Sequence, residues 1–131
     1  MGVIEYPFRP KPRSVAGTRL SQARLMRAIA YMRERMAEPL ELRQVAAAVD
    51  MSVYHFARAF RNTTGIPPYR YLMDCRVDRV RELLSLEEIP LADIAARTGF
   101  ADQSHMSNVF RRATGESPLA YRRRARGTAV D

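Results

Sequence analysis

A chain of 131 residues, of which 47% are hydrophobic, can bury the core of one or two compact units. Its net charge of +8, from 22 basic and 14 acidic residues, indicates an acidic partner such as nucleic acid, an anionic membrane or another acidic surface. The single cysteine, Cys75, excludes an internal disulfide, and no apolar run approaches the about 18–20 residues of a membrane span. Because residues 1–13 also lack the apolar core of a signal peptide, we expect a cytoplasmic protein that has no membrane partner.

The basic residues are almost all arginine. Only Lys11 is a lysine, and the planar fork of donors on arginine suits phosphate groups and guanine. A GC-rich genome would also favour arginine codons, so the arginine content by itself does not identify the partner.

The chain begins with residues 1–20, which are rich in proline and glycine and show no sustained hydrophobic period, so we expect a flexible N-terminal arm there. From residue 20 onward, apolar residues recur at helical spacing between start and stop signals. Examples are Ser21 before the first helix, Gly65 after the third and Pro68 at the start of the fourth. No period-two alternation is long enough to predict a strand. The predicted fold class is all-α, with seven helices over residues 20–37, 41–48, 53–63, 68–86, 91–98, 103–113 and 118–124.

The sequence nearly repeats itself. Residues 50–65 read DMSVYHFARAFRNTTG, and residues 99–115 read GFADQSHMSNVFRRATG. Phe60 and Phe110 lie at equivalent places in the two stretches, and the second copy has one extra residue before its longer helix. Two copies are too few for a solenoid, so a duplicated small module is the better interpretation.

Each copy consists of a short helix, a turn and a longer helix, which is the helix-turn-helix plan. In that plan the longer helix lies in the major groove, so it must be apolar on one side and polar on the other. The predicted inward sides are Phe56, Ala59, Phe60 and Thr63 in the first copy, and Met106, Val109, Phe110 and Ala113 in the second.

The repeat also predicts a domain organisation. The helix between the two copies would be about 25 Å long at ~1.5 Å per residue, a length that suits two recognition helices in successive major grooves ~34 Å apart. The predicted parts are an N-terminal arm over 1–20, a first helix-turn-helix subdomain over 21–66, a linker helix over 67–86, a second subdomain over 87–125 and a C-terminal tail over 126–131.

The outward sides of the two longer helices carry the candidate DNA contacts. Arg58 can form two hydrogen bonds with guanine, and Asn108 can form two with adenine. Arg61, Arg111 and Arg112 lie later on their helices, where phosphate is the expected contact. For one helix alone, a solvated amphipathic face explains the same pattern. Two helices with the same apolar and polar sides, in a basic chain, instead favour a protein that reads two DNA grooves in tandem.

The sequence favours neither a metal site nor an enzyme. His55 and His105 occupy matched positions, but neither is followed by a second ligand three or four residues later, and no cysteine cluster supports them. The chain has no phosphate-binding loop and no Gly-x-Ser-x-Gly or His-Glu-x-x-His motif. We therefore expect no cofactor and no catalytic activity.

Two stretches carry a family resemblance. Residues 42–72, LRQVAAAVDMSVYHFARAFRNTTGIPPYRYL, and residues 94–123, IAARTGFADQSHMSNVFRRATGESPLAYRR, resemble the DNA-binding domain of the AraC/XylS family of bacterial transcription regulators. The resemblance covers residues 21–124. It implies two helix-turn-helix units joined by a linker helix, bound as a monomer to an asymmetric site on double-stranded DNA. It also implies regulation of transcription, usually activation through contact with RNA polymerase.

The resemblance extends to individual positions. The family's base-reading positions fall on Tyr54, Ala57, Arg58, Ser104, His105 and Asn108. We assign phosphate contacts to Ser52, Arg61, Gln103, Arg111 and Arg112.

Three residues depart from the family pattern. Asp50 stands where a turn glycine is common, although aspartate tolerates the left-handed region better than most residues. Met106 replaces a common aromatic residue in the core. Asn108 replaces a common arginine, so the base preference of the second helix cannot be transferred, and the second copy loses one positive charge.

Many family members also carry a domain that binds an effector or dimerises, and residues 1–20 are too few for one. The chain is expected to be either a complete small regulator or the DNA-reading half of a longer protein. Two rival functions are a largely non-specific architectural DNA-binding protein and a protein-interaction module that no longer reads DNA. Arg58 and Asn108 argue against the second rival, and the sequence dependence of binding at fixed salt tests the first.

Overall fold

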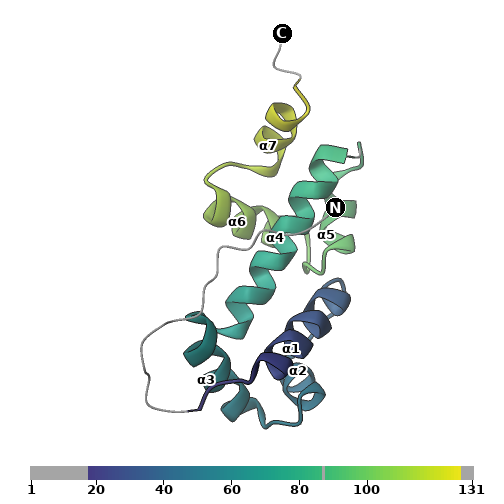
Figure 1. Cartoon of the computed structure of the whole chain (residues 1–131). Helices are drawn as coiled ribbons and strands as arrows, with labels where there is room; N and C mark the ends of the chain where they lie inside the picture. Colours follow the sequence, from purple (N-terminus) through teal and green to yellow (C-terminus); the bar gives the residue numbers. More distant parts are fainter. Residues whose placement is uncertain (1–17, 87, 128–131) are drawn as a thin grey trace. The chain divides into compact units, whose positions relative to one another are not determined.

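The computed structural model describes residues 18–86 and 88–127 (Figure 1). Over these residues the chain forms seven helices and no strand, which confirms the all-α prediction. The predicted arm lies outside the described residues except for residues 18–20, and the predicted tail lies outside them beyond Gly127. The helices are α1 Gln22–Arg35, α2 Leu42–Ala48, α3 Val53–Thr64, α4 Pro68–Leu86, α5 Leu91–Arg97, α6 Gln103–Thr114 and α7 Pro118–Ala125.

Local signals fix where these helices begin and end. The oxygen of a short polar side chain accepts a hydrogen bond from a free backbone N–H at the first turn of α1, α3, α6 and α7, and these caps are Ser21, Ser52, Asp102 and Ser117. Gly65 ends α3 with φ 91°, and Gly115 ends α6 with φ 88°, a left-handed conformation that is cheap only for glycine. Pro68 is the first residue of α4, where its missing N–H costs nothing.

The chain divides into two compact units, one ending at Leu72 and the other beginning at Met73. In the first unit α1 packs on α2, and α2 packs on α3. In the second unit α5 packs on α6, and α6 packs on α7. Each unit therefore contains one short helix followed by one longer helix, as the repeat in the sequence predicts.

The repeat is also visible in the packing of aromatic rings. Phe60 on α3 meets Tyr71 on α4 edge to face, with 5.9 Å between the ring centroids. Phe110 on α6 meets Tyr121 on α7 in the same way at 5.6 Å. Both phenylalanines are fully buried, so each aromatic pair ties the longer helix of its unit to the helix that follows.

The inward sides are confirmed for α3 and only in part for α6. All four residues predicted to face inward from α3 are buried. On α6, Met106 and Phe110 are buried and Val109 is half-buried, but the prediction was wrong for Ala113, which is exposed. The equivalent residue of α3, Thr63, is covered by the segment before α1, whose Leu20 N–H donates to the Thr63 hydroxyl.

The sequence spacing of Leu25, Ile29, Met32 and Met36 predicts the inward face of α1, and the observed face is rotated slightly from it. Leu25 and Met32 are buried as expected, together with Ala28. Ile29 and Met36, which the spacing also placed inward, are only half-buried.

The turn inside each helix-turn-helix motif has a left-handed residue. Asp50 has φ 60° in the first motif and Gly99 has φ 87° in the second. The residue after each also donates the same hydrogen bond, from Met51 N to Ala46 O at 3.0 Å and from Phe100 N to Ala95 O at 3.1 Å. Aspartate therefore does adopt the turn in which the family pattern has glycine.

This turn allows a matched pair of substitutions. We expect Asp50→Gly to raise the free energy of unfolding by up to about 1 kcal/mol, because glycine removes the steric cost of the left-handed conformation. We expect Gly99→Ala to lower it by about 1–2 kcal/mol for the same reason. Urea unfolding of the two variants beside the unmodified chain measures both. A loss of stability in Asp50→Gly would show that the aspartate side chain makes a stabilising contact.

Candidate nucleic-acid interface

The outward side of α3 presents an arginine paired with a tyrosine. Arg58 Nη1 donates a hydrogen bond to Tyr54 Oη at 3.1 Å, and the guanidinium carbon lies 5.7 Å from the centre of the tyrosine ring. Tyr54 is 64% exposed. Because the two residues are four apart on the helix they share one face, so Tyr54 restrains the Arg58 side chain while most of its donors stay available.

The other predicted contacts on α3 border this pair. Ala57 is half-buried, so its methyl group offers a small apolar contact rather than a polar one. Arg61 is exposed, and no hydrogen bond or ion pair engages its side chain within the part of the chain that the structure describes. The α3 face therefore combines a restrained arginine, an exposed aromatic ring and one unpaired cation.

The outward side of α6 is polar and less aromatic. Ser104 and Asn108 are exposed, and so is Gln103, the first residue of the helix. Arg111 and Arg112 are exposed, and among residues 18–86 and 88–127 no carboxylate pairs with either guanidinium. This face combines two small polar groups with two unpaired cations nearer the end of the helix.

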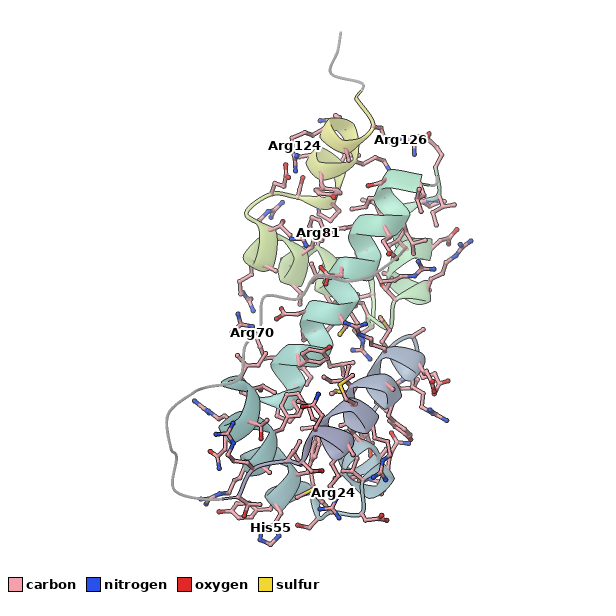
Figure 2. All side chains as sticks on the ribbon, in the orientation of Figure 1. Arg24, His55, Arg70, Arg81, Arg124 and Arg126 are labelled. Carbon is pink, nitrogen blue, oxygen red and sulfur yellow. The ribbon has the colours of Figure 1, made fainter. Side chains whose placement is uncertain are left out.

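The two matched histidines have different surroundings. His55 is exposed and projects from the N-terminal end of α3 in Figure 2, with its Nδ1 3.2 Å from the Ser52 hydroxyl oxygen. His105 is half-buried, and its ring packs edge to face on Phe100 at 5.3 Å between centroids. Its Nδ1 is buried without a hydrogen-bond partner. Only part of the His105 ring is therefore open to a DNA base.

One of the predicted phosphate contacts, Ser52, is also a helix cap, and Asp102 is the equivalent cap in the second unit. Ser52 Oγ accepts from His55 N at 3.3 Å, and Asp102 Oδ1 accepts from His105 N at 2.8 Å. Ser52 is exposed, so its hydroxyl proton can still be donated to a phosphate. The same position in the second unit holds a carboxylate, which repels phosphate.

A family model described as a helix-turn-helix domain matches residues 45–124. This span contains both longer helices with their turns and caps. The chain belongs to the AraC family of helix-turn-helix proteins. The match confirms the resemblance that residues 42–72 and 94–123 indicate.

Individual relatives agree with the assignment to the AraC family. The chain is 32% identical over 97 residues to the MmsAB operon regulatory protein of Pseudomonas aeruginosa, covering 74% of this chain and 32% of that protein. It is 34% identical over 108 residues to the transcriptional activator RhaS of an Enterobacter species, covering 82% of this chain and 39% of that protein. The chain thus spans between about a third and two-fifths of the curated relatives it matches.

A solved structure of the family shows the same fold. The DNA-binding domain of AdpA, crystallised in complex with a target DNA, is 32% identical with a TM-score of 0.75. The similarity covers 80% of this chain and 95% of that one. Homologues and fold both belong to transcription-regulator domains and not to an enzyme.

Several arginines near the C-terminal end make contacts that stabilise the second unit. Arg122 Nη2 donates to the Ile89 carbonyl at 2.8 Å, and Arg126 pairs with Glu88 at 3.1 Å. Arg124 donates to the Glu116 carboxylate, and this hydrogen bond raises the pKa of the guanidinium further above its ordinary value. Figure 2 shows Arg124 and Arg126 at α7. No sequence signal distinguished these from the unpaired arginines, because their partners are distant in the chain or lie in loops.

Two further classes of site are absent from residues 18–86 and 88–127. No group of three or more His, Cys, Asp or Glu side chains is placed to hold a metal ion. Within the same range, no helix is long and apolar enough to cross a bilayer.

The caps allow stability and phosphate contact to be separated at Ser52. We expect Ser52→Ala to lower the free energy of unfolding by about 1 kcal/mol, because the His55 N–H loses its acceptor. We expect Ser52→Asp to keep the stability, since Asp102 caps α6 in this way, while its carboxylate weakens binding to a DNA phosphate. Urea unfolding and a DNA-binding titration on the same samples measure the two effects. Unchanged DNA affinity in Ser52→Asp would remove Ser52 from the phosphate contacts.

Proposed function

We propose that this chain is a sequence-specific DNA-binding transcription regulator that inserts α3 and α6 into successive major grooves of an asymmetric site. The observation that carries the proposal is the pair of capped twelve-residue helices, α3 and α6, each with an exposed polar face. The family match and the similarity to a domain crystallised with its target DNA support the same reading. Such a regulator acts in the cytoplasm, where bacterial DNA is held.

The residues divide into base-reading and phosphate-binding groups. Arg58, restrained by Tyr54, reads guanine through two hydrogen bonds, and Asn108 reads adenine in the same way. The remaining base contacts are Tyr54, Ala57, Ser104 and the open part of His105. The phosphate contacts, which position the protein but carry no sequence information, are Ser52, Arg61, Gln103, Arg111 and Arg112.

The proposed direction of regulation is supported by a relative. RhaS is described as a transcriptional activator, and we propose that this chain also activates, by contact with RNA polymerase and with its DNA-binding part as a monomer. Transcription from a promoter carrying the selected site, with and without the protein, measures the direction of regulation. Reduced transcription would make the protein a repressor and would leave the DNA-reading proposal in place.

The first experiment is selection of bound sequences from a random duplex pool at about 150 mM salt, near physiological ionic strength. Recovery of one asymmetric site with two read segments about one helical turn apart is the expected result. Recovery of one short segment would mean that only one helix reads bases. No enrichment, with affinity that depends on salt alone, would identify a largely non-specific architectural protein.

Arg58→Ala tests base reading. We expect a loss of about 1–3 kcal/mol on the selected site and relaxed preference at one base pair, because a bidentate contact is removed. A titration against the selected duplex and its single-base variants measures both quantities. Tyr54→Phe is the matched control, since it removes the acceptor that restrains Arg58 but keeps the guanidinium, and a smaller loss is expected.

Arg111→Ala tests phosphate binding. We expect weaker binding to every sequence by a similar factor, and a salt dependence whose slope falls by about one, because one fewer counterion is released. Titrations at several salt concentrations on specific and unrelated duplexes measure the slope. If Arg111→Ala relaxed preference at one base pair, Arg111 would belong with the base-reading residues.

A further inference from the structure

The segment before α1 is fastened to the side of the recognition helix α3. Asn62 Nδ2 donates to the Thr18 carbonyl at 2.9 Å, and Leu20 N donates to the Thr63 hydroxyl at 2.8 Å. The second bond is buried, and the Leu20 side chain is buried with it. In Figure 1 this segment, residues 18–20, passes α3 before α1 begins.

Arg19 lies between these two fastened residues. Its side chain is exposed, and within the described chain no carboxylate or backbone carbonyl engages it. Because Leu20 points into the core and Asn62 holds the preceding carbonyl, the backbone on both sides of Arg19 is fixed against α3. The Arg19 guanidinium is thus an unpaired cation within the described chain, and contacts with α3 fix the position of its backbone.

The fastening point lies at the edge of the DNA-facing side. Asn62 follows Arg58 by one helical turn, so the two residues are neighbours on the surface of α3. Asn62 itself is half-buried, whereas Arg58 is exposed. The segment therefore borders the face that carries Arg58, and Arg19 adds positive charge at that border.

In the second copy, the helix positions equivalent to Asn62 and Thr63 hold no such segment among the described residues. The residues equivalent to Asn62 and Thr63 are Arg112 and Ala113, and both are exposed. Alanine has no hydroxyl that could accept a bond as Thr63 does, and among the described residues the Arg112 side chain makes no hydrogen bond to a backbone carbonyl. On α6 this position is itself an arginine, Arg112. On α3 the same position is Asn62, which holds the segment that carries Arg19.

We propose that Arg19 binds a DNA phosphate beside the bases read by α3, and that Asn62 and Thr63 are positioning residues that hold it there. Arg19 supplies to the first unit the charge that Arg112 supplies to the second. This inference rests on the proposed DNA binding, and its tests are chosen so that the two can fail separately.

The test measures the salt dependence of binding to the selected duplex. Loss of one phosphate contact lowers the slope by about 0.9, so the affinity ratio between the unmodified chain and Arg19→Ala should fall about 3.5-fold between about 50 and 200 mM salt. Base preference should not change. Arg35→Ala, the control, removes the same charge from the last turn of α1, where the arginine lies 4.3 Å from the centre of the Tyr31 ring, and should leave the slope unchanged.

The positioning residues are tested with Arg19 in place. Asn62→Ala and Thr63→Val each remove one of the two hydrogen bonds that hold the segment, and each should reproduce part of the slope loss of Arg19→Ala. Thr63→Ser keeps the hydroxyl and should restore the slope. Asn62→Ala leaves the buried bond intact, so it reports on positioning even if Thr63→Val fails to fold.

Each outcome decides between the alternatives. A normal slope in Arg19→Ala, with a reduced slope in Arg61→Ala, would overturn the role of Arg19 and leave DNA binding by α3 standing. Equal slope losses in Arg19→Ala and Arg35→Ala would show a general effect of net charge and would also overturn it. No DNA binding by the unmodified chain would overturn this inference together with the proposed function.

Discussion

An edge-to-face contact between one phenylalanine and one tyrosine holds each of the two longer helices, α3 and α6, against the helix that follows it. Phe60 on Tyr71, and Phe110 on Tyr121, pack edge to face at ring distances below 6 Å. Such pairs contribute about 0.5–1.5 kcal/mol beyond the burial of their area. Because the phenylalanine fixes the inward side of its helix, it also fixes which residues face outward. The polar faces of α3 and α6 can offer a defined set of donors only while these contacts hold.

Much of this organisation could be predicted from the sequence because it follows local rules. Signals at the ends of helices act within one helical turn. The structure has them where the sequence predicts: Ser52 caps α3, Gly65 ends α3, and Pro68 begins α4. The apolar spacing predicted the buried side of α3 equally well. The left-handed turn at Asp50 was predictable for the same reason, since aspartate is one of few residues that tolerate it.

Long-range contacts produced the differences. The hydrogen bond from Leu20 to Thr63 joins residues 43 positions apart, and no periodicity predicts it. That contact covers Thr63. The equivalent residue of the second copy, Ala113, has no such contact and is exposed. The packing of His105 on Phe100 also depends on which residue occupies the turn, since the first copy has Met51 there and leaves His55 exposed. The DNA contacts assigned to both helices remain predictions.

The caps have a consequence for how the two copies can diverge. Ser52 and Asp102 each accept a hydrogen bond from one free N–H group at the start of α3 and α6, and Gly65 and Gly115 end these helices. Each pair of end signals lies within a single copy. The exposed positions between these ends therefore take little part in keeping each helix folded. Mutations can change the outward side chains of one copy without destabilising that copy or altering the other. A duplicated module built in this way can acquire a new target sequence one half at a time, and Asn108, which stands where an arginine is common, is the kind of change that such a history leaves.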